Sequence, residues 1–197
     1  RHNAGFWLLN DIASDYNASF RNESRFHGEV AKISTAGKDI YLLKPATFMN
    51  RSGQSVNALA KYFKISPEQI LVLHDELDLE AGDNRLKKSG GHGGHNGLRD
   101  IINHIGKEFF RLRIGIGHPG DRNQVVNYVL KNPSREDADR LSEASLKTLR
   151  IIPTLLAGEL EKAMPEDVMV STDIGNINSI ANSYLRFEKP RSFFAAM

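Results

Sequence analysis

The sequence contains no cysteine, which removes several kinds of chemistry from consideration. Disulfide bonds, zinc–thiolate sites and cysteine nucleophiles are all excluded. The sequence also has no apolar run of the ~20 residues that a membrane-spanning helix needs, and no segment has the pattern of a signal peptide. We therefore expect a cytoplasmic protein without a membrane partner. Any catalysis must use histidine, carboxylate, lysine, serine or tyrosine side chains.

A strong excess of charge of either sign is also missing. Lysine and arginine total 26 against 24 acidic residues, so the formal net charge is only +2. This balance does not by itself indicate a nucleic-acid-binding protein. Basic residues do gather in the middle of the chain, at Arg85, Lys87, Lys88, Arg111, Arg113 and Arg122. On charge alone, a solvated surface is the simpler interpretation of this group.

The hydrophobic pattern alternates between helical and strand periods, which predicts an α/β fold with a sheet between helices. At 197 residues the chain is long enough for one domain with a sizeable core. The predicted helices cover residues 4–16, 52–63, 96–105, 123–131 and 134–150, with Pro153 ending or kinking the last. The predicted strands cover residues 26–34, 39–45, 70–73, 83–88 and 112–116. The short apolar run at 70–73 is typical of a central, buried strand.

Both ends of the chain depart from this pattern. The first predicted helix has no strand before it, although an α/β domain normally supplies one. Residues 166–197 lose the apolar stripe and are rich in asparagine and serine. We therefore expect a strand to be missing before Arg1, leaving a gap in the sheet beside residues 70–73. The alternative, in which part of the tail fills that position, is less favoured because the tail lacks a strong strand pattern.

The densest unusual feature is the segment 89–97, which has five glycines and two histidines directly before a predicted helix. Glycine permits positive φ angles and a close approach of ligand to backbone. Free amides at the following helix start, which we expect Asn96 to cap, suit an anion or a carbonyl oxygen. This favours a functional loop over a flexible connector. His92 and His95 have no third ligand at a recognised spacing, so we expect no metal.

Three further motifs are less specific. Residues 115–120 match the dinucleotide-binding pattern G-x-G-x-x-G, but Pro119 lies within it, so we interpret it as a tight turn after a strand. Asp75 follows the most buried strand and could orient a histidine, or it could be an ordinary polar strand end. Asn50 could cap the helix at 52–63 or present its amide to a cleft. The residues leave both alternatives open.

Five motifs together carry more weight than any one of them. They are Arg1-His2-Asn3-Ala4-Gly5, Thr47-Phe48-Met49-Asn50-Arg51-Ser52-Gly53, His74-Asp75-Glu76-Leu77-Asp78, Gly91-His92-Gly93-Gly94-His95-Asn96-Gly97 and Arg111-Leu112-Arg113-Ile114-Gly115-Ile116-Gly117-His118-Pro119-Gly120. In this order and spacing, the chain resembles bacterial peptidyl-tRNA hydrolase over roughly residues 1–165. The tail at 166–197 falls outside the resemblance, as does the strand and glycine-rich loop with which members of that family begin.

The resemblance implies a single-domain, twisted mixed sheet between helices, acting as a monomer without cofactor or metal. It implies hydrolysis of the ester bond between peptide and tRNA, with the nascent peptide and the acceptor stem as partners. Catalytic positions match His2 as the base, Asp75 as its orienting carboxylate, and Asn50 and Asn96. Substrate-binding positions match Phe48, Met49, Asn50, Gly93, His95 and Asn96. Positions near the tRNA match Arg85, Lys87, Arg113 and Arg122.

Two other activities on the same fold remain as alternatives. One is an RNA-binding module without turnover, as in a chloroplast relative that takes part in intron splicing. The other is a metal-dependent peptidase of similar fold, whose metal ligands should lie at other positions. Turnover on peptidyl-tRNA separates the first from a hydrolase, and insensitivity to a chelator separates the second.

Overall fold

A computed structural model describes residues 1–35, 37–156 and 191–196 of the chain. The helices are α1 (Ala4–Asp15), α2 (Ser52–Phe63), α3 (Asn96–Ile105), α4 (Val125–Leu130) and α5 (Arg135–Leu156). The strands are β1 (Arg21–Glu23), β2 (Gly28–Thr35), β3 (Lys38–Pro45), β4 (Ile70–Glu76), β5 (Asn84–Lys88), β6 (Phe110–Gly115) and β7 (Arg191–Ala196). No helix among the described residues is long and apolar enough to cross a membrane.

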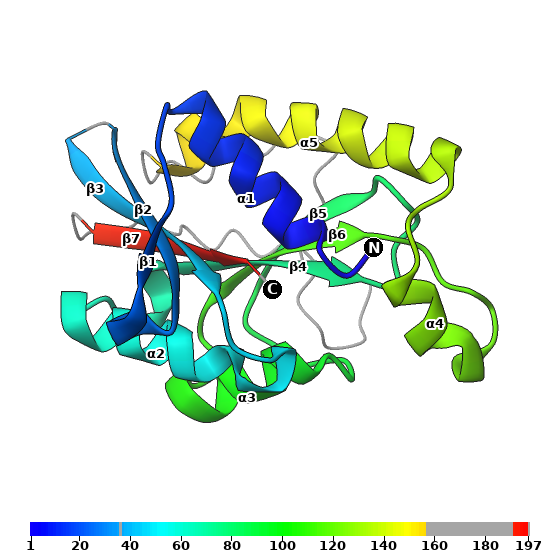
Figure 1. Cartoon of the computed structure of the whole chain (residues 1–197), viewed down its shortest axis with the longest axis horizontal. Helices are drawn as coiled ribbons and strands as arrows, with labels where there is room; N and C mark the ends of the chain where they lie inside the picture. The colour runs from blue at the N-terminus through cyan, green and yellow to red at the C-terminus, as the bar shows by residue number, and fades with distance from the viewer. Residues whose placement is uncertain (36, 157–190, 197) are drawn as a thin grey trace, which may run out of the picture.

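The strands form one mixed sheet in the order β1-β2-β3-β7-β4-β6-β5 (Figure 1). The pairs β3–β7, β7–β4 and β4–β6 are parallel, while β1–β2, β2–β3 and β5–β6 are antiparallel. Helices α1 and α5 cover one face, and α2 and α3 cover the other. This architecture confirms the predicted α/β fold with a sheet between helices.

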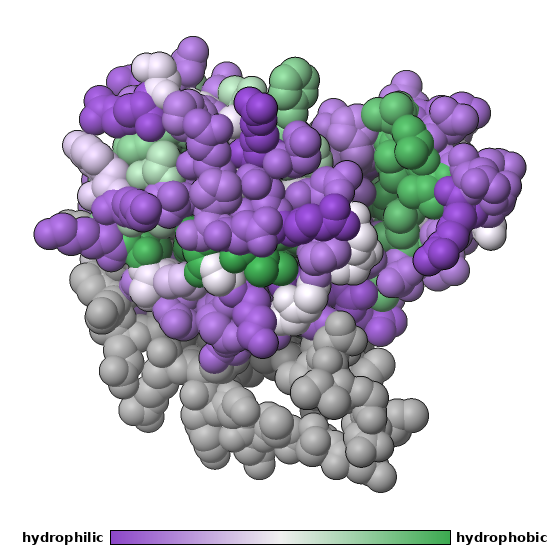
Figure 2. Space-filling model, turned by 90° about the horizontal axis from the view of Figure 1, so that it is seen from below, coloured by the Kyte–Doolittle hydropathy of each residue, from purple (hydrophilic) through white to green (hydrophobic). Residues whose placement is uncertain are grey.

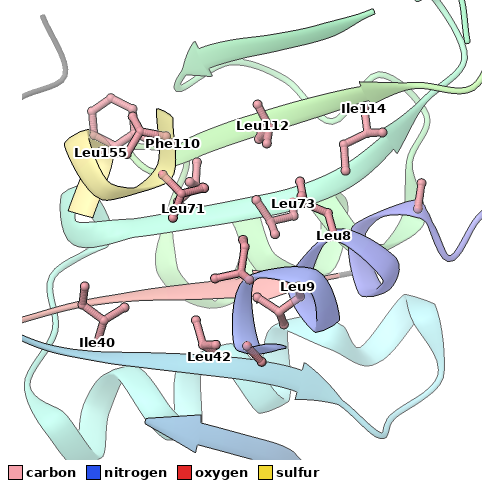
Figure 3. Packing of buried hydrophobic residues seen from close by; sticks show 14 of the residues in the cluster. Leu8, Leu9, Ile40, Leu42, Leu71, Leu73, Phe110, Leu112, Ile114 and Leu155 are labelled. Carbon is pink, nitrogen blue, oxygen red and sulfur yellow. The ribbon is translucent and has the colours of Figure 1, made fainter. Parts of the chain in front are cut away.

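The core consists of two apolar layers, one on each side of the sheet. Because successive side chains of a strand point to opposite faces, β4 contributes to both layers. Leu71 and Leu73 join the layer beneath α1 and α5, where Figure 3 shows Leu73 next to Leu8 of α1 and Leu71 next to Leu155 of α5. Ile70 and Val72 join the layer beneath α2 and α3. The prediction that residues 70–73 form a buried central strand is therefore confirmed.

The sheet formed by the described residues has no gap beside β4, so the expectation of a gap at that position was wrong. Strand β7, from the end of the chain, lies between β3 and β4 and is parallel to both (Figure 1). Its register places Arg191 opposite Asp39 and Ala196 opposite Leu73. The less favoured alternative holds because an unpaired central position would leave the backbone groups of two strands without partners. The predicted boundary between residues 165 and 166 lies outside the described residues.

Two local predictions about glycine and proline had different outcomes. The interpretation of 115–120 as a strand end that no helix directly follows is confirmed: β6 ends at Gly115, and α4 begins only at Val125. A side chain at Gly115 would meet the backbone carbonyl of Glu80, which explains the glycine there without any nucleotide. Pro153, by contrast, does not end the last helix, since α5 continues to Leu156. The short strand β1 was not predicted.

Candidate active site

Most of the predicted site residues lie on segments that meet near the carboxyl ends of β4 and β6. Asp75 is in β4, and the segment 89–95 leads from β5 to α3, which begins at Asn96. Asn50 lies in the 3₁₀ turn Met49–Arg51 before α2. His2 precedes α1, and Figure 1 places the N-terminus near the ends of β4 and β6, beside α4.

His95 links β4 to the start of α3. Its Nε2 lies 3.4 Å from Oδ1 of Asp75. Its Nδ1 accepts hydrogen bonds from the amides of Gly97, at 3.2 Å, and Leu98, at 3.3 Å. A nitrogen that accepts from two amides carries no proton, so the proton of the neutral ring is on Nε2 and points to the carboxylate. Asp75 and His95 therefore form one oriented pair.

His95, and not the predicted Asn96, is the N-cap of α3. Asn96 is already the first residue of the helix, and among the described residues its exposed side chain makes no hydrogen bond. The amides of Gly97 and Leu98 are also occupied by His95, so they do not provide the free anion site expected at this helix start. The side-chain amide of Asn96 remains available to a ligand.

His74 supports this pair from the interior of the protein. Its Nδ1 donates to the backbone carbonyl of Asp75 at 2.8 Å, and its ring lies 5.4 Å from the ring of His95. Burial, with a further effect of the neighbouring His95, lowers the pKa of His74 well below its ordinary value. His74 is therefore neutral at physiological pH, and its ring restrains the backbone carbonyl of Asp75.

His2 is bound to α4 and not to Asp75. Its backbone amide and its Nδ1 both lie 3.1 Å from the carbonyl oxygen of Val129. Because a carbonyl oxygen only accepts, Nδ1 carries the proton and Nε2 has a free lone pair. No hydrogen bond joins His2 to Asp75 in the described part of the chain. The negative charge of Asp75 nevertheless reaches this segment. Burial lowers the pKa of the Arg1 amino group, and the charge of Asp75 partly offsets this by raising it.

A hydrogen bond joins the start of α2 to the middle of α3, on the same face of the sheet. Asp100 of α3 accepts a hydrogen bond from the amide of Gly53 in α2, at 2.7 Å from Oδ2. A side chain at Gly53 would collide with the backbone of Asp100, so the helices can approach this closely only with glycine there. The turn with Met49 and Asn50 also contacts α3. This contact brings the segments of Asn50 and Asn96 together.

The predicted substrate-binding residues differ in accessibility. Phe48 is 80% exposed, Asn50 and Gly93 are exposed, and Met49 is half-buried. Ser52 fixes the turn by donating from Oγ to the Met49 carbonyl at 2.8 Å. Phe48 can therefore offer an apolar surface to a substrate, whereas Met49 packs against the core between the sheet and helices α2 and α3.

The four basic positions matched to tRNA are not equivalent. Arg85 and Arg113 lie opposite each other on β5 and β6 and are bound to Asp83, at 2.7 Å, and to Glu76, at 2.9 Å. Arg122 is exposed in the 3₁₀ turn before α4. Lys87 is only 6% exposed, which does not suit a direct contact with phosphate.

Sequence reasoning missed the role of α4. The Val129 carbonyl that binds His2 is a backbone atom, and residue types carry no signal for it. The helix also exposes apolar side chains, with Val126 and Leu130 66% and 64% accessible. Figure 2 shows an apolar patch at the end of the molecule where α4 lies. The sequence signal that could have indicated a role for this helix was the pair of apolar residues, Val126 and Leu130, on one face of a predicted surface helix.

Comparison with known proteins identifies the family of the chain. The model of the family described as peptidyl-tRNA hydrolase matches residues 1–172, most of the chain. The chain belongs to the peptidyl-tRNA hydrolase family.

Relatives within this family are similar over most of their length. The peptidyl-tRNA hydrolase of Neisseria meningitidis (strain FAM18) is 56% identical over 164 residues, covering 83% of this chain and 85% of the relative. That of Coxiella burnetii (strain CbuG_Q212) is 54% identical over 167 residues, covering 84% and 87%. A crystal structure of peptidyl-tRNA hydrolase from Acinetobacter baumannii superposes with a TM-score of 0.81 at 47% identity, covering 83% and 84%. Fold and family were thus both predicted correctly from the sequence motifs.

Proposed function

We propose that the chain hydrolyses the ester bond between peptide and tRNA in peptidyl-tRNA, with His2 as the base that activates water. Membership of the peptidyl-tRNA hydrolase family supports the reaction. The observation that carries the role of His2 is its hydrogen bond to the Val129 carbonyl, which holds the proton on Nδ1 and leaves Nε2 to accept one. We further propose that the chain works as a monomer in the cytoplasm, without metal or cofactor.

The reaction needs one proton transfer in each direction. Nε2 of His2 takes a proton from water as the water oxygen bonds to the ester carbon. The imidazolium so formed is stabilised by the Val129 carbonyl and by the negative charge of Asp75. When the ester C–O bond breaks, the imidazolium returns the proton to the ribose oxygen of tRNA. No covalent intermediate with the protein is required.

Two amide side chains are suited to the charge that develops on the ester oxygen. Asn50 and Asn96 are exposed, and the segments that carry them lie close together. A side-chain amide donates hydrogen bonds without changing its charge, as an oxyanion site requires. We propose that these two side chains bind either the oxyanion or the backbone of the peptide. Phe48, Met49, Gly93 and His95 complete the proposed peptide site.

The function is tested by measuring release of labelled amino acid from N-acetylaminoacyl-tRNA by the purified chain in excess chelator. The expected result is many turnovers per enzyme molecule, unaffected by the chelator. Tight binding of the tRNA without release would instead identify an RNA-binding module. Loss of turnover on chelation would identify a metal-dependent enzyme.

Replacement of Asp75 by asparagine is expected to lower kcat more than it raises KM. Asparagine retains the shape but removes the charge that stabilises the imidazolium, and its amide can present a donor to His95 Nε2. Asp78→Asn, at an exposed position of the same segment, is the matched control and should retain wild-type kinetics. Steady-state assays on N-acetylaminoacyl-tRNA measure both constants. A change confined to KM would assign Asp75 to substrate binding.

Binding of tRNA is expected to weaken as salt increases, about equally for different tRNAs. Phosphate contacts release counterions, so each contact removed flattens the log–log salt dependence by ~0.7–0.9. We expect this change for Arg113→Ala and Arg122→Ala, but not for Arg140→Ala on α5, which pairs with Glu136. Filter binding at several salt concentrations measures the slope. A variant that changes the ranking among tRNAs at constant slope would indicate base recognition instead.

A further inference from the structure

Arg111 of β6 makes an unusual contact beneath the glycine-rich segment. Its side chain is 3% exposed, and it lies on the opposite face of β6 from Phe110 and Leu112, which join the core beneath α1 and α5. One guanidinium nitrogen, Nη1, donates to the carbonyl of Gly91, and Nη2 donates to the carbonyl of Gly90. A planar guanidinium can bind two adjacent acceptors at once, which an ammonium group cannot do in the same geometry.

The segment that Arg111 holds has few restraints of its own. Ser89, Gly90, Gly93 and Gly94 all have positive φ angles, at 61°, 103°, 55° and 86°. The glycines in this segment can adopt many backbone conformations besides these. Fixing the segment in one of them therefore costs much conformational entropy. At its far end, the His95 amide donates to the His92 carbonyl at 2.9 Å, and α3 follows.

The order of the chain links this anchor to the site. Arg111 fixes residues 90 and 91, and His95 and Asn96 follow within five residues. His95 in turn contacts Asp75 and caps α3, and the Asn96 side chain is available to substrate. A shift of the segment at its anchored end would therefore displace both groups.

We propose that Arg111 is a positioning residue for hydrolysis: its guanidinium holds the Gly90 and Gly91 carbonyls and thereby fixes the segment that presents His95 and Asn96. The inference rests on the proposed function for its effect on rate, but not for its effect on the segment. Arg111 is buried beneath the segment and is not assigned a contact with substrate. It acts on the reaction through His95 and Asn96.

The test compares Arg111→Ala and Arg111→Lys with wild type, and uses Arg140→Ala on α5 as the control for loss of an arginine. We expect Arg111→Ala to lower kcat by about 10²-fold, the effect of a displacement of about 1 Å at a catalytic group, with tRNA affinity nearly unchanged. Arg111→Lys keeps the positive charge but cannot bind both carbonyls at once. Its kcat should therefore lie between that of wild type and that of Arg111→Ala. Arg140→Ala should match wild type.

Hydrogen exchange distinguishes positioning from general destabilisation. In Arg111→Ala, and to a lesser extent in Arg111→Lys, the amides of residues 89–98 should exchange faster while those of β4 stay protected. A folded Arg111→Ala with wild-type kcat would overturn the inference, as would lowered kcat with unchanged exchange in 89–98. If Arg111→Ala does not fold, the same two criteria apply to Arg111→Lys. Absence of hydrolysis in wild type would instead refute the proposed function, and the exchange result would still decide the role of Arg111.

Discussion

Replacement of His2 by alanine is expected to slow peptide release from N-acetylaminoacyl-tRNA by about 10²–10⁴-fold, the usual contribution of a general base. The structure offers His2 as a base because its Nδ1 proton is bound to the Val129 carbonyl and its Nε2 is free. The backbone amide of residue 2 also binds Val129, and this bond survives the substitution. The chain should therefore fold normally and bind tRNA with an affinity within a few-fold of wild type.

Single-turnover rates, with tRNA affinity measured separately, distinguish the chemical step from binding. His118→Ala is the matched control, since His118 is an exposed histidine in the turn after β6, where its Nδ1 accepts from the Gly120 amide. This control should release peptide at the wild-type rate. A His2→Ala enzyme that hydrolyses at a near-wild-type rate would exclude His2 as the base.

A chain that ends before Arg191 is expected to lose cooperative folding. Strand β7 pairs with β3 on one side and with β4 on the other, so its removal leaves two central strands with unpaired backbone groups. Each buried group left without a partner costs about 1–3 kcal/mol. A domain of this size has only ~5–15 kcal/mol of net stability, which such a loss exceeds. Circular dichroism and thermal unfolding measure the result.

The control for this truncation is a chain that lacks only Met197, which follows β7. It should unfold at the same temperature as the full chain. A point variant, Phe194→Pro, tests the strand with less disruption, because proline removes one ladder donor from a strand paired on both sides. A truncated chain with an unchanged, cooperative unfolding transition would show that β7 does not support the sheet.

Local sequence patterns predicted the parts of the fold that depend on local rules. The run at residues 70–73 identified a strand that is buried on both faces, and β4 has this property. The periodic apolar residues at 4–16 predicted α1, whose buried face includes Leu8, Leu9 and Ile12. Strand β7 could not be predicted in the same way. Its position depends on an opening between β3 and β4, which only the assembled sheet defines.

The site shows the same division between residue type and geometry. The motifs identified His2, Asp75, Asn50 and Asn96, but the sequence could not give their hydrogen-bond partners. His2 is oriented by a backbone carbonyl, and α3 is capped by a histidine, a residue outside the preferred capping set. Lys87 lies opposite Arg111 in the register of β5 and β6, and its burial follows from tertiary packing. These features are set in three dimensions.

The most direct test of the central claim, attack of a His2-activated water on the ester carbon, is a single turnover in H₂¹⁸O with excess enzyme. Mass spectrometry then locates the label in the released peptide, the tRNA and the protein. We predict one ¹⁸O atom in the peptide carboxyl group, none in the tRNA 3′ end and none in the protein, with the same incorporation about 10²–10⁴-fold slower in His2→Ala. The rival nucleophile is the buried Asp75 carboxylate at the same site. Label in the Asp75 side chain after one turnover would contradict direct attack by water.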